Sequence, residues 1–318
     1  MKIKRTLALL LLFAVLSAAP GCARSPQGNE TGDALTSSVS FTDDLGRQLT
    51  ITEKPERVAA LIGSFADIWC LAGGKNTLVA AANDSWTSFD LGLDDTVADL
   101  GAVKEPNFEV LLSAEPDFIL ASCNTAADLE LLSRFEKLGI ACAFFDVQSF
   151  DDYLRMLKIC TDLTDCPENY HLYGEETAAL VEASIGRNDG SSPSVLCIRA
   201  TGSSCKVKGS SGNVLGEMLA DLGCVNIADG NDLLLENLSM EAIMEADPDY
   251  IFAVLQGSDT RDAQKVLEQT LLTNPAWGTL TAVREDRFYV LENALYNLKP
   301  NSRWGIAYEK LADILYKK

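Results

Sequence analysis

The sequence is short of the residues on which many enzymes and metal sites depend. His171 is the only histidine among 318 residues, and no Cys-x-x-Cys pair occurs. A Ser-His-Asp triad or a zinc site of clustered histidines therefore has almost no material. The Gly-x-Ser-x-Gly motif is absent, and residues 72–77 lack the spacing of a phosphate-binding loop. We expect a protein with no catalytic residues, no metal site of its own and no cofactor.

Positive charge is scarce as well. The chain has 26 Lys and Arg against 46 Asp and Glu, a net charge of −20 at pH 7. Such a surface repels phosphate backbones, so nucleic acid is not an expected partner. Hydrophobic residues make up 47% of the chain, which allows buried cores, and the length favours two domains over one. No spacing singles out a catalytic pair among so many acids.

No stretch is apolar over the length that a membrane-spanning helix needs, and the longest apolar run covers only Leu7–Leu16. Three basic residues precede this run and small residues follow it, which predicts a targeting peptide over residues 1–21. The segment resembles a bacterial lipoprotein signal. That resemblance implies cleavage before Cys22 and lipidation of its thiol. The mature chain would then carry a net charge of −23, because residues 1–21 contain three bases and no acids.

Residues 22–37 are polar and contain Gly, Ser and Pro, a composition typical of a flexible tether. We therefore expect an extracytoplasmic protein, anchored by lipid at Cys22 to the outer face of the cell membrane. Ordinary secretion with a free Cys22 is the alternative. Nine cysteines in an exported chain could indicate disulfides, but their spacing gives no framework. Cys160 could pair with Cys166, or Cys197 with Cys205, and the sequence leaves both open.

The chain is organised around one long predicted helix, residues 165–190. Asp165 and Glu168 fit a capping box, Pro167 suits the first turn, and residues 188–190 (NDG) end the helix. Strands and helices alternate on both sides, and the strands are nearly continuous apolar runs, which indicates parallel sheets covered on both faces. We predict an α/β fold with two lobes, each with a central mostly parallel sheet flanked by helices, joined by this single bridging helix. A crossover helix within one domain is the alternative.

The lobes are expected at residues 38–164 and 191–318, and two matching segments support their similarity. Residues 107–122 read NFEVLLSAEPDFILAS, and residues 239–254 read SMEAIMEADPDYIFAV. Each combines a short helix with an acid near its start, a break made of an acid and a proline, and a buried strand. The repetition suggests that both lobes contain the same strand-and-helix unit.

Several short segments connect the chain to a known family. They are residues 42–47 (TDDLGR), 54–58 (KPERV), 112–117 (LSAEPD), 236–239 (ENLS), 274–277 (NPAW) and 299–304 (KPNSRW). In their order and spacing, from Val39 to the C-terminus, they resemble the solute-binding proteins of bacterial ABC importers, in the group that takes up iron-siderophores, haem and corrinoids. The resemblance implies two α/β lobes joined by a fairly rigid helix. It also implies a ligand cleft between the lobes and delivery to a membrane permease and its ATPase.

The resemblance further implies that Glu109 and Glu241 dock the protein on the permease. They occupy matching places in the two repeated segments and would pair with permease arginines. An Arg–carboxylate pair can be bidentate. One such pair on each lobe would therefore attract the protein to the permease and also fix its orientation on it. The alternative is that each is an ordinary acid at the start of a helix, favoured by the helix dipole. The protein itself is expected to be a monomer.

In open α/β sheets, ligands sit beyond the carboxyl ends of the strands, and those ends carry aromatic and cationic residues here. Aromatic walls suit a flat or apolar chelate, and cations suit carboxylate or catecholate groups. Trp86 is the leading candidate, because a ring in a polar loop has no role in a helix or strand. The predicted ligand-binding residues are Ser64, Phe65, Trp86, Lys104, Asn107, Asn124, Lys206, Lys208, Tyr296 and Arg303.

A ferric siderophore or a corrinoid brings its own metal ligands, so the protein need supply only walls and charges. Haem is the less favoured ligand, because it would need a His, Tyr or Met ligand and only Tyr296 is a cleft candidate. Two other functions stay open: an exported enzyme with cleft carboxylates, and a sensory or adhesive lipoprotein that kept the fold. Ligand binding without turnover would distinguish a solute-binding protein from an enzyme. Genes for a permease and an ATPase beside this one in the genome would distinguish it from a sensory or adhesive lipoprotein.

Overall fold

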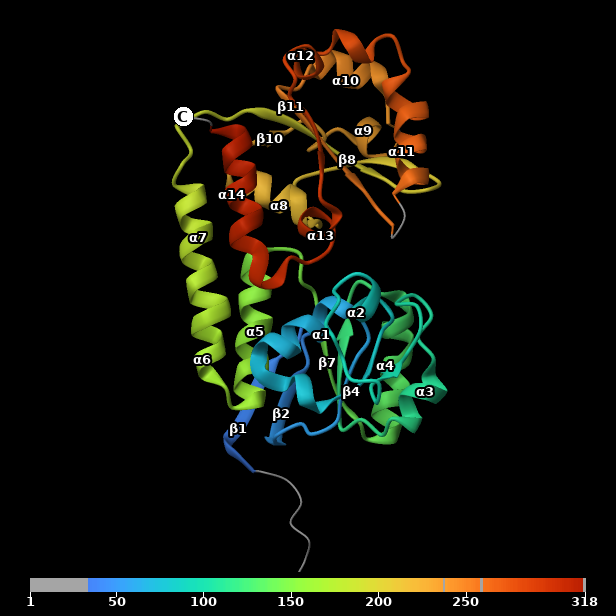
Figure 1. The fold of residues 1–318 in the computed structure, drawn as a ribbon, viewed down its shortest axis with the longest axis vertical. Helices are drawn as coiled ribbons and strands as arrows, with labels where there is room; N and C mark the ends of the chain where they lie inside the picture. Colours follow the sequence, from blue (N-terminus) through green and yellow to red (C-terminus); the bar gives the residue numbers. More distant parts are fainter. Residues whose placement is uncertain (1–33, 237, 258–259, 317–318) are drawn as a thin grey trace, which may run out of the picture. The chain divides into compact units, whose positions relative to one another are not determined.

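The computed structural model describes residues 34–318 except 237, 258–259 and 317–318 (Figure 1). The predicted signal peptide, Cys22 and the first part of the predicted tether lie outside the described residues. The first described element, β1 (Ala34–Thr42), begins inside the segment predicted as a tether. It pairs antiparallel with β2 (Gln48–Glu53). The carboxylate of Asp43 accepts hydrogen bonds from the backbone N–H groups of Leu45 and Arg47, which stabilises the turn between them.

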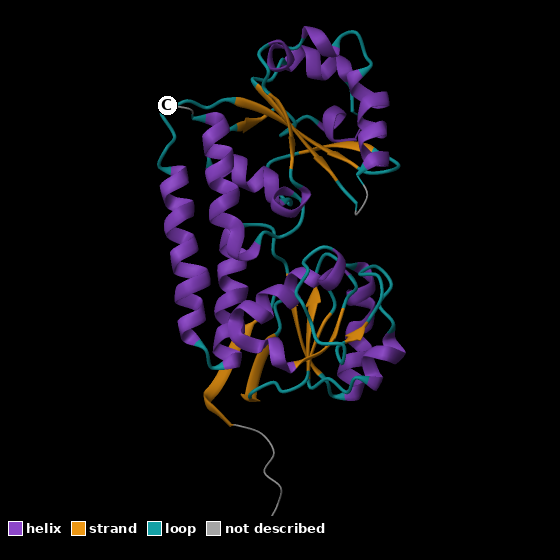
Figure 2. Cartoon of the chain, viewed as in Figure 1, coloured by secondary structure: helices purple, strands orange, loops and turns teal. Residues whose placement is uncertain are grey.

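The N-terminal lobe is built on a parallel five-stranded sheet of order β5-β4-β3-β6-β7, with helices on both sides (Figure 2). Its strands are β3 (Val58–Ala60), β4 (Leu78–Ala81), β5 (Ala98–Asp99), β6 (Phe118–Ser122) and β7 (Ala141–Phe145). Its helices are α1 (Gly63–Trp69), η1 (Cys70–Gly74), η2 (Lys75–Thr77), α2 (Asp84–Thr87), α3 (Phe108–Ser113), α4 (Ala126–Leu138) and α5 (Phe150–Thr164).

Strand β6 shows why these apolar runs become central strands. All five of its residues are buried. Phe118 and Leu120 belong to one hydrophobic cluster, while Ile119 and Ala121 belong to another. Because successive side chains of a strand point to opposite faces, both faces of the sheet are covered.

The C-terminal lobe repeats this plan. Strands β10-β8-β11-β12 form a parallel sheet, and β9 pairs antiparallel with β8. The strands are β8 (Ser194–Ala200), β9 (Cys205–Lys208), β10 (Val225–Asn226), β11 (Tyr250–Leu255) and β12 (Phe288–Leu291). The helices are α8 (Val214–Asp221), α9 (Asp232–Glu236), α10 (Met240–Ala246), α11 (Arg261–Leu267), η4 (Glu268–Leu272), η5 (Trp277–Thr279), α12 (Thr281–Arg284), α13 (Asn293–Tyr296), η6 (Asn301–Arg303) and α14 (Trp304–Leu315). The predicted fold class, two α/β lobes with mostly parallel sheets, is confirmed.

One helical stretch joins the lobes, and its start differs from the prediction. It runs without interruption through α6 (Pro167–Tyr170), η3 (His171–Glu175) and α7 (Glu176–Ile185). The predicted capping box is wrong, because Asp165 ends α5 with φ of 54° and Cys166 precedes α6 without a side-chain cap. The left-handed residue reverses the chain, so that α6 packs back on α5.

In the C-terminal lobe, the bridging helix is held by the last helix. Helix α14 packs against α7, which buries Thr177, Val181 and Ser184. Gly305 lies at the point of contact, where an added Cβ would come within 2.7 Å of the Leu180 Cβ atom. Leu180 itself is 56% exposed, so it is not part of the buried face of the helix. The absence of a side chain at Gly305 therefore sets how closely the two helices approach.

A second tie links the segment before α14 to the N-terminal lobe. Asn301 is fully buried, with φ of 54°, and its side-chain N–H donates to the Ser64 carbonyl oxygen at 2.9 Å. The same amide donates to the Asp67 carboxylate at 2.7 Å. Burial raises the pKa of Asp67, while the bond from Asn301 and the charge of Arg303 oppose the rise. Two neighbouring residues of α1 are thereby bound to the C-terminal segment.

The cysteines play no covalent part in this framework. All eight cysteines of the described chain are free thiols, including Cys160 and Cys166, and Cys197 and Cys205. No helix among the described residues combines the length and the apolarity needed to cross a membrane.

We predict that Gly305→Ala lowers the free energy of unfolding by about 1–3 kcal/mol, because the new methyl group forces α14 away from α7. Thermal or denaturant unfolding measures the change. Gly278→Ala is the matched control, since an added Cβ there meets no atom within 4 Å. The control should shift stability by less than about 0.5 kcal/mol. Equal stability of both variants would show that the helix contact at Gly305 is not tight.

Candidate ligand-binding site

A pocket with an empty volume of about 450 Å³, part of it open to solvent, lies at the ends of the C-terminal lobe strands. Strands β8, β9 and β11, the start of α8 and the segment after α13 contribute to it, and Gln148 contributes from the N-terminal lobe. The lining residues are Gln148, Cys197, Ile198, Arg199, Lys208, Gly212, Asn213, Val214, Leu215, Val254, Tyr296, Asn297 and Lys299. The position agrees with the rule that ligands bind beyond the carboxyl ends of parallel strands.

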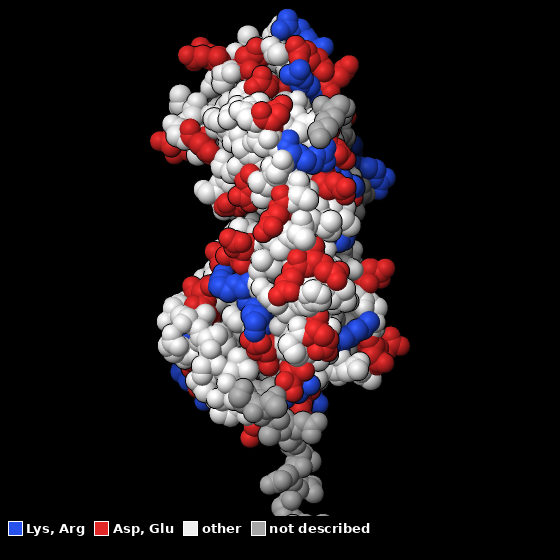
Figure 3. Space-filling model, turned by 90° about the vertical axis from the view of Figure 1, so that its left-hand side faces the viewer, with Lys and Arg blue, Asp and Glu red and all other residues white. Residues whose placement is uncertain are grey.

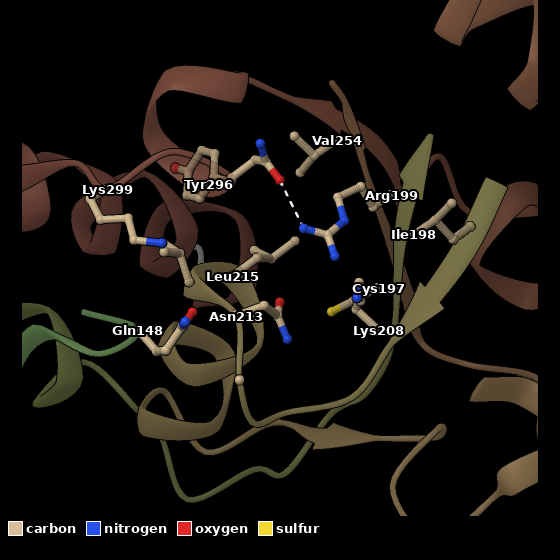
Figure 4. A pocket seen from close by; sticks show the side chains of 13 residues that line it. Gln148, Cys197, Ile198, Arg199, Lys208, Asn213, Leu215, Val254, Tyr296 and Lys299 are labelled. Atoms are coloured by element: carbon tan, nitrogen blue, oxygen red, sulfur yellow. Dashed lines mark hydrogen bonds between the residues drawn. The ribbon is translucent and has the colours of Figure 1, made fainter. Parts of the chain in front are cut away.

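Three cations line this pocket, and none of the described lining residues is acidic. Arg199 is the last but one residue of β8, Lys208 ends β9, and Lys299 lies between α13 and α14. Figure 4 shows the Arg199 guanidinium and the Lys299 ammonium group directed into the pocket from opposite sides. In a chain with 46 acids, such a group of cations is a departure from the rest of the surface. The arrangement suits an anion.

The three cations lack full compensation for their burial. Burial lowers the pKa of Lys299, and the charge of Arg199 lowers it further, whereas Asp146 and Asp152 oppose the shift. The pKa of Lys208 is lowered by burial and by the charges of Arg199 and Lys206. Burial also lowers the pKa of Arg199. An anionic group placed between them would favour the charged forms again.

Neutral side chains of the pocket are held in place by hydrogen bonds. Arg199 Nη1 donates to Asn297 Oδ1 at 3.2 Å, which orients the guanidinium. Asn213 caps α8 by accepting from the Gly216 N–H and donates to the Gly209 carbonyl oxygen. The amide of Gln148 donates to Asp146. The pocket therefore presents hydrogen-bonded polar groups beside the charged side chains of Arg199, Lys208 and Lys299.

Tyr296 is the one aromatic residue among the described residues that line the pocket, and its hydroxyl group already has a hydrogen-bond partner. It donates to the Ala307 carbonyl oxygen at 3.1 Å, and burial raises its pKa. A phenol with a raised pKa and an internal acceptor is poorly suited to act as an anionic metal ligand. Nor does the described part of the chain contain a group of three or more His, Cys, Asp or Glu side chains that could hold a metal ion.

Of the ten predicted ligand-binding residues, Lys208 and Tyr296 line this pocket and the others lie elsewhere. Ser64 and Phe65 are buried in α1, where Phe65 packs edge-on against Phe145. Trp86 is not in a loop but on the short helix α2, partly buried against the core of its lobe. The argument that its ring lacked a structural role is therefore wrong.

The remaining predicted residues are polar groups on the surface or at caps. Asn107 is the N-cap of α3, and its side-chain oxygen accepts from the N–H groups of Glu109 and Val110. Asn124 donates to Asp146. Lys104 and Lys206 are exposed, and Arg303 is half-buried. None of these five side chains belongs to the pocket.

Sequence reasoning missed Arg199, and it pointed to the chain segments that hold Gln148 and Lys299 without selecting either residue. A signal for Arg199 was present, because a guanidinium near the end of the apolar run SVLCIRA has to find a polar environment. Lys299 belongs to the family-like segment KPNSRW, but that segment follows a helix and not a strand. Its place beside the strand ends depends on how the chain returns after α13.

The two predicted docking acids hold equivalent positions. Glu109 is the second residue of α3, after the N-cap Asn107, and Glu241 is the second residue of α10, after the N-cap Ser239. Both are exposed. In each case the side chain of the N-cap residue, two positions before the glutamate, makes the cap, so the glutamate side chain is not needed to cap the helix.

Comparison with known proteins places the chain in a family. The family model named periplasmic binding protein matches residues 58–295. The putative ABC transporter substrate-binding lipoprotein YhfQ of Bacillus subtilis (strain 168) is 24% identical over 316 residues, 93% of each chain. The Fe(3+)-citrate-binding protein YfmC of the same organism is 25% identical over 288 residues, 88% of this chain and 86% of its own.

The fold also matches solved structures. The periplasmic heme-binding protein RhuT from Roseiflexus sp. RS-1, in apo form, has a TM-score of 0.67 at 19% identity, over 82% of this chain and 98% of that one. The family model covers most of the chain, and the two relatives cover almost all of it. The chain therefore belongs to the periplasmic binding protein family: it is an extracytoplasmic substrate-binding protein of ABC import and not an enzyme.

Proposed function

We propose that the chain captures a ferric siderophore with carboxylate groups and delivers it to the permease and ATPase of an ABC importer. The observation that carries this proposal is the pocket with Arg199, Lys208 and Lys299 and no acid among its described lining residues. Guanidinium and ammonium groups bind carboxylates by charge-assisted hydrogen bonds. The ligand brings its own metal, so the protein needs no cofactor.

The names of the relatives leave the ligand open, since one is named for ferric citrate and a similar structure for haem. The residues of the pocket favour a carboxylate chelate such as ferric citrate over haem. Among its described lining residues none is His or Met, and the Tyr296 hydroxyl donates to Ala307. A corrinoid, the other ligand expected from the sequence, offers less negative charge to three cations and ranks below a carboxylate chelate.

The anchoring part of the proposal concerns residues outside the structure. Cys22 would carry the lipid, and residues 23–33, before β1, would let a monomeric binding protein reach the permease from the outer face of the membrane. The relative YhfQ is named as a lipoprotein, which supports the same arrangement here. Two or more acyl chains suffice for stable anchoring, whereas one does not.

Ferric citrate is the simplest probe of the pocket. Arg199→Ala and Lys208→Ala should each weaken its binding about 10- to 100-fold, because each removes a charged hydrogen-bond donor worth about 1.5–3 kcal/mol. Tryptophan fluorescence during titration measures the affinity, with cobalamin and haem as competing candidates. Lys137→Ala, at an exposed lysine of α4, controls for the loss of one positive charge. Unchanged affinity in the Arg199 variant, or tighter binding of cobalamin or haem, contradicts the proposal.

Lysine titration provides a second prediction. Because the pKa values of Lys208 and Lys299 are lowered, these groups lose their protons at a lower pH than a surface lysine does. Affinity for a carboxylate chelate should therefore be complete below these pKa values and fall as the pH rises through them. Lys299→Arg should extend binding to higher pH, since a guanidinium stays protonated. An exchange-inert chromium(III) citrate complex allows the measurement at alkaline pH, and coincident profiles for the two proteins would refute the role of Lys299.

Docking through Glu109 and Glu241 is tested in cells. The double variant Glu109→Ala, Glu241→Ala should keep its ligand affinity and melting temperature while uptake of radioactive iron chelate falls sharply, because the permease arginines lose their partners. If the acids served only the helix dipole, stability would instead fall by roughly 0.5–1 kcal/mol for each, and uptake by the folded protein would be normal. Glu168→Ala, an exposed acid on α6, is the control.

A further inference from the structure

The two lobes bring different groups to the candidate pocket. Arg199, Lys208 and Lys299 line it from the C-terminal lobe, and Gln148 lines it from the N-terminal lobe. The side-chain amide of Gln148 donates to the carboxylate of Asp146 at 2.9 Å. Figure 4 shows Gln148 and Lys299 on the same side of the pocket. Asp146 is not among the described lining residues, but it is one hydrogen bond away from them.

The local structure fixes the position of Asp146. It follows β7 directly, and its backbone N–H group donates to the Asp44 carboxylate at 2.6 Å. Its own carboxylate oxygen Oδ1 accepts from the side-chain amides of Asn124 and Gln148. Both of these donors are neutral, so they orient the carboxylate and leave its charge in place.

The acids next to Asp146 already have a cation. Arg155 forms ion pairs with Asp44 and, at 2.9 Å, with Asp152. Over the described parts of the chain, by contrast, no ion pair includes Asp146. Asp146 therefore carries the least compensated negative charge of this group.

The charge of Asp146 acts on Lys299. Burial lowers the pKa of Lys299, Asp146 opposes this shift, Arg199 adds to it, and Asp152 opposes it. Asp146 thus favours the ammonium form of Lys299. It also satisfies part of the positive charge that an anionic ligand would otherwise meet, so the acid and the ligand compete for the same cation.

We propose that Asp146 is a positioning residue that limits the negative charge of the chelate, because it supplies Lys299 with a counter-charge with which the ligand must compete. This inference rests on the proposed capture of a carboxylate chelate. A chelate with negative charge on all sides is repelled by Asp146. The preferred ligand is therefore asymmetric: its carboxylates face Arg199 and Lys208, and its side towards Asp146 and Gln148 carries hydroxyl or amide groups.

Asp146→Asn tests the inference, because an amide of the same shape can still accept from Asn124 and Gln148. Affinity for the exchange-inert chromium(III) citrate complex, in mildly acidic buffer, should tighten about three- to tenfold, since a competing charge is removed. Asp146→Ser is a second neutral variant with the same expectation. Melting temperatures establish that the variants are folded.

Asp249→Asn is the matched control. The Asp249 carboxylate also accepts from a neutral side chain, that of Ser194, at 2.8 Å. It precedes β11 and faces the first residue of β8, so it lies at the opposite ends of these strands from the pocket. This variant loses one negative charge as well, and its affinity for the citrate complex should stay unchanged.

The pH profile distinguishes a role of charge from a role in holding Gln148. Without Asp146, the pKa of Lys299 falls further, so the variant should lose the citrate complex at a lower pH than the unmodified protein does. NMR of lysine side chains with isotope-labelled methyl groups measures this pKa without ligand, and Lys299→Arg identifies the signal. If the carboxylate only held Gln148, its replacement would weaken binding and leave the pKa of Lys299 unchanged.

The outcomes separate this inference from the proposed function. If Arg199→Ala weakens citrate binding and Asp146→Asn does not tighten it, the inference is wrong and the proposed function stands. An unchanged pKa of Lys299 in the Asp146 variants also overturns the inference. If the unmodified protein does not bind the citrate complex, both the inference and the proposed function fail.

Discussion

The close packing of α14 on α7 at Gly305 is the contact on which the two-lobed arrangement depends. The stretch α6–α7 is one hydrogen-bonded run that packs on α5 at one end and on α14 at the other. Bending it would break backbone hydrogen bonds and separate α14 from the face that buries Thr177 and Val181. Asn301 adds a buried polar tie to Ser64 and Asp67. Arg187, just after α7, also forms an ion pair of 2.7 Å with Asp313 of α14. On the side shown in Figure 3, acidic groups are spread over the surface of the protein.

Much of the fold could be predicted from the sequence, because buried parallel strands have an unambiguous pattern. Continuous apolar runs such as residues 118–122 can only lie between two covered faces. The start of the bridging helix could not be predicted in the same way. The residues DCPE satisfy the spacing of a capping box, but Asp165 takes a left-handed conformation that an aspartate tolerates. Whether it caps the next helix or ends the previous one depends on the chain reversal, which is a tertiary constraint.

The candidate site, like the fold, could be predicted from the sequence only in part. The strand ends pointed to Lys208 and Tyr296, and both residues line the candidate pocket. They also identified Phe65 and Trp86, because an aromatic residue after a strand can pack on the core as easily as on a ligand. Lys299 reaches the pocket from the segment between α13 and α14, so its contribution depends on the path of that segment. Residue type alone could not distinguish these cases.

The charges of the pocket explain why an anion is the ligand to expect. Removing three cations from water in a pocket whose described lining includes no acid is unfavourable. The pKa values of Lys208 and Lys299 are lowered by this burial, although Asp146 and Asp152 oppose the shift at Lys299. Replacing the three cations with apolar residues would remove this cost of burial in the free protein. A bound carboxylate relieves it too, since it restores a favourable environment for each charge. A neutral ligand would leave the cations buried without a counter-charge, so the charges of the pocket discriminate against it.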